Sequence, residues 1–300
     1  MTRILLVGCT GQLGQELQRT LVPLGEVIGV GRETMDLSQT ASVRQAIVEV
    51  KPDLIVNAAA YTAVDKAESE PELAKAINTI APTIMAEEAQ RLGATLVHIS
   101  TDYVFDGRKN TPYTEDDIPN PIGVYGQTKF AGEEGIRNNC DRHLILRTAW
   151  VYGTFGKANF VKTMLRLFAT RDEVRVVADQ VGAPTWTADL AHAITVLLSP
   201  PSPEPEQPSL PTGTYHYTNS GVTSWYDFAV AIFEEAKLLG YQVQVQRIVP
   251  ISTAEYPTPA SRPAYSVLSS KKISALLGNH PPHWRQALRQ MLSSLHSATA

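Results

Sequence analysis

The sequence predicts an α/β fold, with a doubly wound parallel sheet followed by a smaller C-terminal α/β subdomain. Two observations predict it. Short β-branched runs alternate with longer stretches of helical periodicity through the first half, and glycines recur where the first run meets the first helical stretch. Such alternation is typical of a parallel sheet with helices on both faces. We expect the domain with the parallel sheet to span residues 1–150 and the C-terminal subdomain to span residues 151–300, with an interleaved boundary.

The first half consists of short apolar runs separated by stretches whose apolar residues recur every three or four positions. Pro82 should bend the third helix or begin a new turn, because proline cannot donate a backbone hydrogen bond. The strands are expected at residues 4–8, 26–30, 53–59, 95–100 and 143–149, and the helices at 12–22, 38–50, 71–92 and from about 124.

The second half is less regular. The Pro-rich segment 199–211 predicts an exposed loop. Strands are expected at residues 174–179, 213–219 and 243–249, and helices at 187–198, 223–239, 270–277 and 283–295.

Composition excludes several classes of protein. The net charge is −4 and the pI is about 6.0, so there is no basic surface for nucleic acid. No apolar run reaches the ~18 residues of a membrane span, and the first residues lead into a strand pattern rather than a signal peptide. The two cysteines, Cys9 and Cys140, are too few for a disulfide framework or a zinc site. We therefore expect a cytoplasmic protein that binds neither nucleic acid nor membrane.

Gly8, Gly11 and Gly14 lie between the first strand and the first helix. Glycines here allow a tight turn and a close approach of the backbone to a pyrophosphate, which the N–H groups of the helix N-terminus then bind. The spacing is GxxGxxG rather than the common GxGxxG, and a purely structural turn is the alternative. The position of the turn favours a Rossmann-type dinucleotide site.

The end of the second strand indicates which dinucleotide binds. An acidic residue there usually binds the adenosine ribose, but this chain has Gly31 and Arg32. A guanidinium can pair with a 2′-phosphate, so the sequence favours NADPH, with NADH as the alternative. Asp36 and Leu37 are candidates to flank the adenine, and a surface role is the alternative for Arg32.

Tyr125 and Lys129 lie four residues apart, which places both on one face of a helix. A phenol has a pKa of about 10, and we expect the ammonium to favour the phenolate and to hold the nicotinamide ribose. Thr101 follows the fourth strand, at the sheet edge where ligands bind, and its hydroxyl can reach a substrate carbonyl. Each signal is weak alone, but their order along the chain is typical of a dehydrogenase.

The chain resembles the extended short-chain dehydrogenases/reductases, and it is similar to their dTDP-4-dehydrorhamnose reductase branch. The resemblance runs from residue 8 to 268. The stretches that carry it are GCTGQLGQEL, VNAAAYTAVDKAE, INTIAP, STDYVFDG, YGQTKFAGE, LRTAWVYG, NFVKTML, DQVGAPTW and SRPAYSVL. STDYVFDG and DQVGAPTW are the most specific to this branch.

The resemblance implies a role for each matched residue. Thr101, Tyr125 and Lys129 would be the catalytic residues. Gly11, Gln12 and Leu13 would wrap the cofactor pyrophosphate, and Ala60, Tyr61 and Thr62 would lie against the cofactor. The residues implied to bind the nucleotide-sugar substrate are Thr101, Asp102, Trp150, Asn159, Gln180 and Arg262.

One departure concerns metal and assembly. Some members of the branch bind a metal between two subunits through carboxylates near the C-terminus, but residues 256–300 of this chain contain none. We expect no metal site, and the chain is compatible with either a homodimer or a monomer.

The expected reaction is the reduction of the C4 ketone of dTDP-4-dehydro-L-rhamnose in dTDP-rhamnose biosynthesis. One alternative is a nucleotide-sugar dehydratase or epimerase of the same fold. Dehydratases carry Asp and Glu directly after the threonine, whereas here Asp102 is followed by Tyr103. The other alternative is a non-catalytic regulator that resembles the β subunit of methionine adenosyltransferase. A regulator could lose the proton relay, which this chain keeps.

Overall fold

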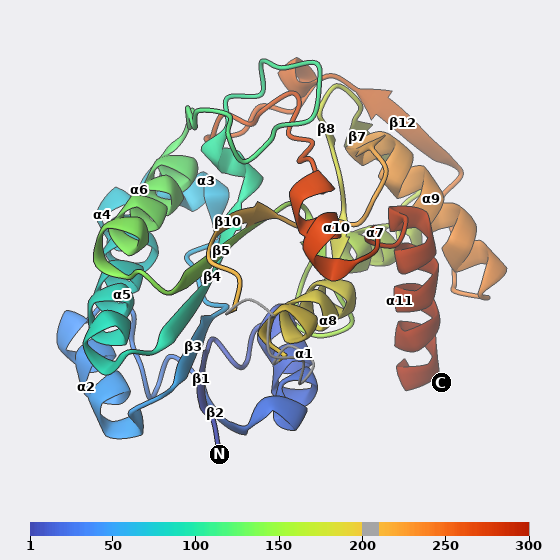
Figure 1. The fold of residues 1–300 in the computed structure, drawn as a ribbon. Coiled ribbons are helices and arrows are strands. Elements are labelled where there is room, and N and C mark those ends of the chain that lie inside the picture. The colour runs from blue at the N-terminus through green and yellow to red at the C-terminus, as the bar shows by residue number, and fades with distance from the viewer. Residues whose placement is uncertain (200–209, 300) are drawn as a thin grey trace.

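The computed structural model describes residues 1–199 and 210–299, and a six-stranded parallel sheet forms the centre of the first half (Figure 1). The strand order is β10-β5-β4-β3-β1-β2, and all neighbouring strands are parallel. The strands are β1 (Arg3–Val7), β2 (Glu26–Val30), β3 (Leu54–Asn57), β4 (Thr95–Thr101), β5 (His143–Thr148) and β10 (Gly213–His216). The predicted doubly wound parallel sheet is confirmed.

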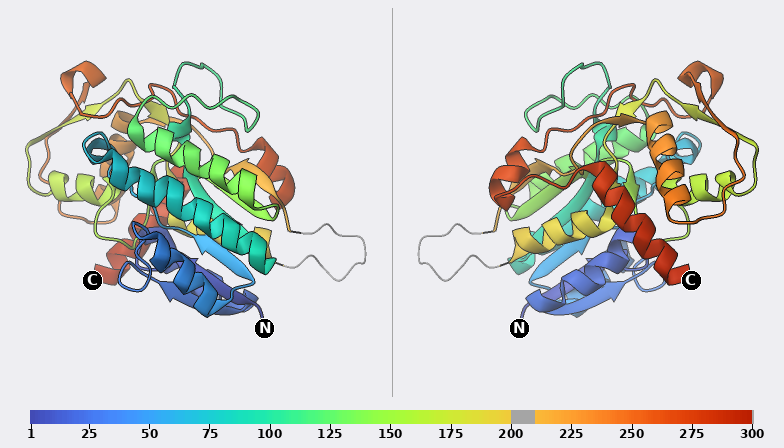
Figure 2. Two further views of the ribbon diagram at one scale, coloured as in Figure 1. Left: turned by 90° about the vertical axis from the view of Figure 1, so that its left-hand side faces the viewer. Right: turned by 90° about the vertical axis from the view of Figure 1, so that its right-hand side faces the viewer.

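Helices cover both faces of this sheet, because successive strand residues point to opposite sides. On one face, Leu5 and Val7 of β1 pack in one core with residues of α2 (Thr40–Val50), α5 (Ala81–Leu92) and α6 (Val124–Asn139). On the other face, Ile4 and Leu6 pack with residues of α1 (Gln12–Thr20) and α8 (Thr187–Leu198). Figure 2 shows α5 and α6 side by side across the first of these faces.

The stretch around Pro82 is helical throughout, but its hydrogen-bond pattern changes just before the proline. It consists of α4 (Pro71–Lys75), the π-helix η2 (Ala76–Ile80) and α5, and Pro82 lies in the first turn of α5. A proline is tolerated in a first turn, where its missing N–H has no partner inside the helix. The short helix α3 (Val64–Ala67) precedes this stretch.

The second half forms a separate core of helices and short strand pairs, drawn to the right of the sheet in Figure 1. The helices of this core are α7 (Phe160–Phe168), α9 (Trp225–Leu238) and α11 (Trp284–Thr299), whereas α10 (Lys271–Leu277) packs against α8 and β10 of the first sheet. The strands are β6 (Val151–Tyr152), β7 (Glu173–Val177), β8 (Val181–Gly182), β9 (Thr185–Trp186), β11 (Thr223–Ser224) and β12 (Arg247–Ile251). Single 3-10 turns occur in both halves: η1 (Val22–Leu24) and η3 (Asp102–Val104) in the first, and η4 (Thr253–Glu255) in the second.

The strand expected at 243–249 is wrong in its position, since β12 begins at Arg247. The strand expected at 213–219 exists as β10 (Gly213–His216), and it pairs with β5 at the edge of the first sheet. Most of the loop expected at 199–211 lies outside the described residues. In the described part of the chain, no helix has the length and apolar character needed to cross a membrane.

Candidate active site

A cavity of about 540 Å³ lies at the ends of β1, β2, β3, β4 and β5. The carboxyl edge of a parallel sheet is the usual place for a ligand, because the turns that follow each strand converge there. The predicted site residues on its wall are Gly8, Gly11, Gln12, Leu13, Arg32, Ala60, Thr62, Thr101, Asp102, Tyr125, Lys129 and Trp150.

The glycine turn forms one end of this wall. Gly8 has φ +81°, and a Cβ there would lie 2.8 Å from Cβ of Ala59, so no larger residue fits. Gly14 is not on the wall, and a Cβ there would lie 2.1 Å from the carbonyl oxygen of Gly8, so it permits α1 to pack against the turn. In the described structure, α1 has neither a capping side chain nor an acidic residue in its first turn. Its positive N-terminal end is therefore available to an anion.

Arg32 reaches the cavity from the end of β2, and its side chain is exposed. The structure does not bring Asp36 and Leu37 to the wall. Asp36 accepts hydrogen bonds from the backbone N–H and hydroxyl of Ser38, and these bonds lower its pKa. Leu37 is buried in the core beside α2. Arg32 is thus the one of these three whose position fits a cofactor phosphate.

The turn after β3 contributes Ala60 and Thr62 to the wall, while Tyr61 points away. The hydroxyl of Tyr61 donates a 2.6 Å hydrogen bond to Glu70, which raises the pKa of Tyr61 to about 12. Its backbone N–H donates to the side chain of Asn78 in the π-helix. Tyr61 thus holds the turn in place through its backbone.

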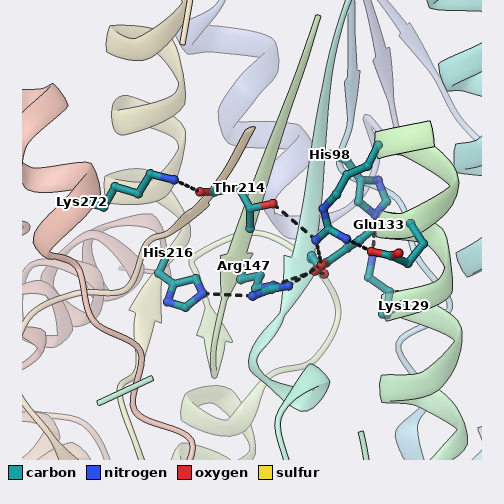
Figure 3. Close-up of polar contacts among 10 residues, drawn as sticks. His98, Lys129, Glu133, Arg147, Thr214, His216 and Lys272 are labelled. Carbon is teal, nitrogen blue, oxygen red and sulfur yellow. Dashed lines mark hydrogen bonds and ion pairs between the residues drawn. The ribbon is translucent and has the colours of Figure 1, made fainter. Parts of the chain in front are cut away.

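Tyr125 and Lys129 lie on α6, one turn apart, and both reach the cavity wall. Burial raises the pKa of Tyr125 to about 12, against the opposing effect of a hydrogen bond with Thr101. The expectation that Lys129 lowers this pKa is wrong for the chain by itself. The Lys129 amine is held instead 2.7 Å from the carbonyl oxygen of Ile99 and 3.0 Å from Nε2 of His98 (Figure 3).

Thr101 ends β4, Asp102 begins η3, and both residues are buried. The Thr101 hydroxyl donates to Oδ1 of Asp102 at 3.1 Å and accepts from the backbone N–H of Tyr103 at 3.2 Å. Burial raises the pKa of Asp102 to about 6. Together with the half-buried Tyr125, these residues place two hydroxyls and one carboxyl on the wall of the cavity.

A second cavity of about 290 Å³ lies in the second half, and Gln180 and Arg262 line it. Trp150, on the wall of the first cavity, stacks on Trp225, on the wall of the second. The sequence interpretation missed Trp225, because nothing in its local pattern distinguishes it from a core residue. This aromatic pair therefore joins the wall of the first cavity to the wall of the second.

Asn159 lies between the two halves rather than on either wall. Its side-chain amide donates to Gln12 Oε1 at 3.3 Å and to the carbonyl oxygen of Gly153 at 2.9 Å. Its Oδ1 accepts from the backbone N–H of Lys162 and so caps α7. Asn159 therefore ties the start of α7 to the glycine turn.

Arg262 is held by an ion pair that the sequence interpretation also missed. Its guanidinium lies 2.8 Å from Oδ2 of Asp65, and Asp65 also accepts from the backbone N–H of Ala260. The ion pair holds Arg262 in place through a residue that lies 197 positions away in the sequence.

Comparison with known proteins identifies this arrangement. A family model described as the RmlD substrate binding domain matches residues 1–297. The chain belongs to this family. The dTDP-4-dehydrorhamnose reductase of Escherichia coli (strain K12) is 44% identical over 305 residues, with 99% of both chains covered. The spore coat polysaccharide biosynthesis protein SpsK of Bacillus subtilis (strain 168) is 46% identical over 299 residues, again with 99% of both covered.

Solved structures agree with this membership. A dTDP-4-dehydrorhamnose reductase from Bacillus anthracis str. Ames, solved in complex with NADP, has a TM-score of 0.88 and 38% identity, covering 98% of this chain and 99% of that one. The UDP-glucose 4-epimerase of Thermus thermophilus, solved with NAD, has a TM-score of 0.79 at 21% identity over 99% of this chain and 100% of that one. The epimerase shares the fold, which extends beyond the RmlD family to other nucleotide-sugar enzymes.

Proposed function

We propose that this chain is an NADPH-dependent reductase that converts the C4 ketone of dTDP-4-dehydro-L-rhamnose to the alcohol of dTDP-L-rhamnose, in dTDP-rhamnose biosynthesis. The observation that carries this proposal is full-length similarity to dTDP-4-dehydrorhamnose reductases together with a buried Thr101 and Lys129 and a half-buried Tyr125 on one cavity wall. The family relation gives the reaction, and the cavity supplies the groups that the reaction needs.

The residues present fit a dinucleotide phosphate. Gly8 and Gly11 leave room for a pyrophosphate at the uncapped start of α1, and Arg32 offers a guanidinium to a 2′-phosphate. Ala60 and Thr62 would lie against the dinucleotide from the turn after β3. NADH is the alternative cofactor, and the role of Arg32 decides between the two.

Bound NADPH would supply the hydride that reduces the carbonyl carbon. The chain's own residues would handle the carbonyl oxygen. Thr101 would donate a hydrogen bond that orients this oxygen, and Tyr125 would donate its phenolic proton as the alkoxide forms. A phenol whose pKa is held near 12 stays protonated until the stronger base, the alkoxide, develops beside it. Lys129 would hold the ribose and, in its protonated form, stabilise the phenolate that remains.

The nucleotide-sugar part of the substrate would extend from the first cavity toward the second. Trp150 and Asp102 border the sugar end, and Gln180 and Arg262 line the far end. Arg262 is a suitable partner for a diphosphate, because Asp65 orients its guanidinium without burying it fully. Asn159 would act by holding the start of α7 against the glycine turn.

Two other functions compete with this proposal. A dehydratase would need a second carboxylate beside Asp102, where the chain has Tyr103. A regulatory protein would not need Thr101, Tyr125 and Lys129 on one cavity wall. A cytoplasmic location stays a prediction from the sequence.

The test is an assay of the purified chain with several 4-keto nucleotide sugars, each with NADPH and with NADH. We expect oxidation of NADPH coupled to formation of the dTDP-6-deoxyhexose. Turnover of UDP-sugars without net reduction would point to an epimerase, and no turnover with any 4-keto sugar would favour the regulator.

A further inference from the structure

A row of buried side chains runs from the turn after β3 to Lys129. Oδ1 of Asn57 accepts a 3.1 Å hydrogen bond from the backbone N–H of Ala59. Nδ2 of Asn57 lies 3.1 Å from Nδ1 of His98, and Nε2 of His98 lies 3.0 Å from Nζ of Lys129. The side chains of Asn57, His98 and Lys129 are all about 1% exposed or less.

The direction of each hydrogen bond in this row follows from its first member. A backbone N–H can only donate, so Oδ1 of Asn57 must face Ala59 and the amide nitrogen must face His98. That nitrogen also only donates, so Nδ1 of His98 must accept. A neutral imidazole with one accepting nitrogen carries its proton on the other, so His98 is the Nε2–H tautomer.

The last member of the row is thereby fixed as well. Nε2–H of His98 donates toward Lys129, and an ammonium has no lone pair to accept it, whereas a neutral amine does. The amine keeps two hydrogens, and one can be donated to the carbonyl oxygen of Ile99 at 2.7 Å. With an ammonium, two donors would face each other somewhere along the row, whichever way Asn57 and His98 are arranged.

We propose that Asn57 and His98 are positioning residues that tie the charge of Lys129 to the direction of the hydrogen-bond row, so that the row as it stands holds the neutral amine and protonation of Lys129 requires a reversal of the row. The reversal would turn the amide of Asn57 and release the backbone N–H of Ala59, which lies on the cavity wall. The charge of Lys129 is therefore coupled to the turn that faces the cofactor. This inference rests on the proposed function only for the catalytic role of Lys129.

The surrounding charges agree with this arrangement. Burial lowers the pKa of Lys129 to about 8, and the carboxylate of Glu133 opposes this fall. Burial and the nearby Lys129 lower the pKa of His98 well below its ordinary value, so the imidazole stays neutral. Tyr125 and Glu133 lie one helical turn to either side of Lys129 on α6. His98 contacts Lys129 from β4, and Arg147 on β5 forms an ion pair with Glu133 (Figure 3). The negative charge nearest to Lys129 is thus already paired.

The test uses NMR of the ligand-free, full-length chain. In protein labelled with ¹⁵N-histidine, and with His98 assigned by its loss in His98→Gln, we expect the Nε2–H tautomer above the titration midpoint of Lys129. In protein labelled with ¹³C-lysine, and with Lys129 assigned by its loss in Lys129→Met, we expect a midpoint near 8. Neither measurement involves cofactor or substrate, so the result stands apart from the success or failure of the proposed reaction.

Asn57→Asp should reverse the row, because a carboxylate accepts from both Ala59 and His98. His98 should then carry its proton on Nδ1, and the Lys129 midpoint should rise by about 1–3 pH units, the usual effect of a nearby opposite charge. Asn139→Asp adds the same charge at the end of α6, where the side chain of Asn139 donates to the carbonyl oxygen of Gly135, and should leave both signals unchanged.

His98→Gln should keep the titration midpoint of Lys129 low, since a glutamine amide can accept a hydrogen bond from Asn57 and donate one to Lys129. An Nδ1–H tautomer in the unmodified chain above the midpoint would overturn the proposal, and so would an unmoved midpoint in Asn57→Asp. If Asn57→Asp does not fold, the tautomer of the unmodified chain and the midpoint of His98→Gln still decide the question.

Discussion

Trp150 and Trp225 stack with their ring centroids 3.5 Å apart and their planes only 8° from parallel. Trp150 has φ +47°, a left-handed conformation that a non-glycine residue adopts at a cost. The stack holds Trp150 in this conformation, with one face against Trp225 and part of the indole on the wall of the first cavity. The pair thereby links the proposed reaction centre to the second cavity.

Replacement of Trp225 tests the importance of this stack. Trp225→Ala should raise KM for the nucleotide sugar roughly two- to tenfold, since an aromatic pair contributes about 0.5–1.5 kcal/mol beyond its buried area. Affinity for NADPH should change little, because Trp225 lines only the second cavity. Steady-state kinetics and cofactor titration measure the two effects. Trp225→Phe keeps a ring and should give a smaller change, whereas equal effects on both ligands would show general damage.

Removal of the phenol at Tyr125 tests the proton donor. Tyr125→Phe should lower kcat by about 10²–10⁴-fold, the usual contribution of general acid catalysis. NADPH binding should persist, since the ring keeps its edge contact with Tyr103. Tyr241→Phe removes a hydroxyl that contacts the carbonyl oxygen of Leu292, away from the cavity, and serves as the control. Turnover of Tyr125→Phe close to that of the control would contradict the assignment.

The phosphate preference depends on Arg32. Arg32→Ala should weaken NADPH binding roughly ten- to hundredfold, because a hydrogen bond to a charged group contributes about 1.5–3 kcal/mol. NADH lacks the 2′-phosphate, so its dissociation constant should stay nearly unchanged. Fluorescence titration of both cofactors gives the comparison within a single variant. If both lose affinity equally, Arg32 does not bind the phosphate.

The buried pair of Glu133 and Arg147 should contribute to stability. The two side chains lie 2.6 Å apart and are 0% and 2% exposed. Glu133→Gln leaves the guanidinium buried without a matching charge and should lower the free energy of unfolding by about 3–5 kcal/mol. Glu134→Gln breaks the half-exposed pair with Arg137 and should cost about 0–1 kcal/mol. Urea denaturation of both variants measures the difference.

The same pair predicts a pH dependence. Burial raises the pKa of Glu133, but the hydrogen bond and charge of Arg147 outweigh it, so the pKa lies below its ordinary value of 4.5. A group with a lowered folded pKa stabilises the fold above its unfolded pKa, and this contribution is lost as the pH falls through the folded pKa. The difference in the free energy of unfolding between Glu133→Gln and the unmodified chain should therefore become smaller below pH 4.5. A difference in the free energy of unfolding that stays constant until the protein unfolds in acid would contradict this pH dependence.

Chelation should leave the protein unchanged. Residues 256–300 contain no carboxylate, and no cluster of three or more His, Cys, Asp or Glu side chains able to hold a metal occurs in the described residues. A hard cation such as Mg²⁺ prefers oxygen ligands and usually needs a carboxylate. The molar mass from light scattering should be the same with EDTA as with added Mg²⁺. The activity should also be the same under the two conditions. A shift from dimer to monomer on chelation would reveal a metal site built between subunits.

The sequence by itself determined the central sheet and the glycine turn. Strands and amphipathic helices can be recognised by the spacing of their apolar residues. The tight turn can be recognised by Gly8 itself, because glycine adopts backbone conformations that other residues rarely adopt. The spacing of Tyr125 and Lys129 likewise placed them on one helix face. These features depend on residues a few positions apart, so they can be found without knowing how the elements pack.

Only the tertiary structure decided the contacts between distant segments. It placed β10 beside β5, paired Arg262 with Asp65, and stacked Trp225 on Trp150. It also turned Lys129 toward His98, and it raised the pKa of Tyr125 through burial where the sequence had suggested the opposite. Burial and partners of this kind arise when whole elements pack against one another, and no local period of the sequence encodes which surfaces will meet.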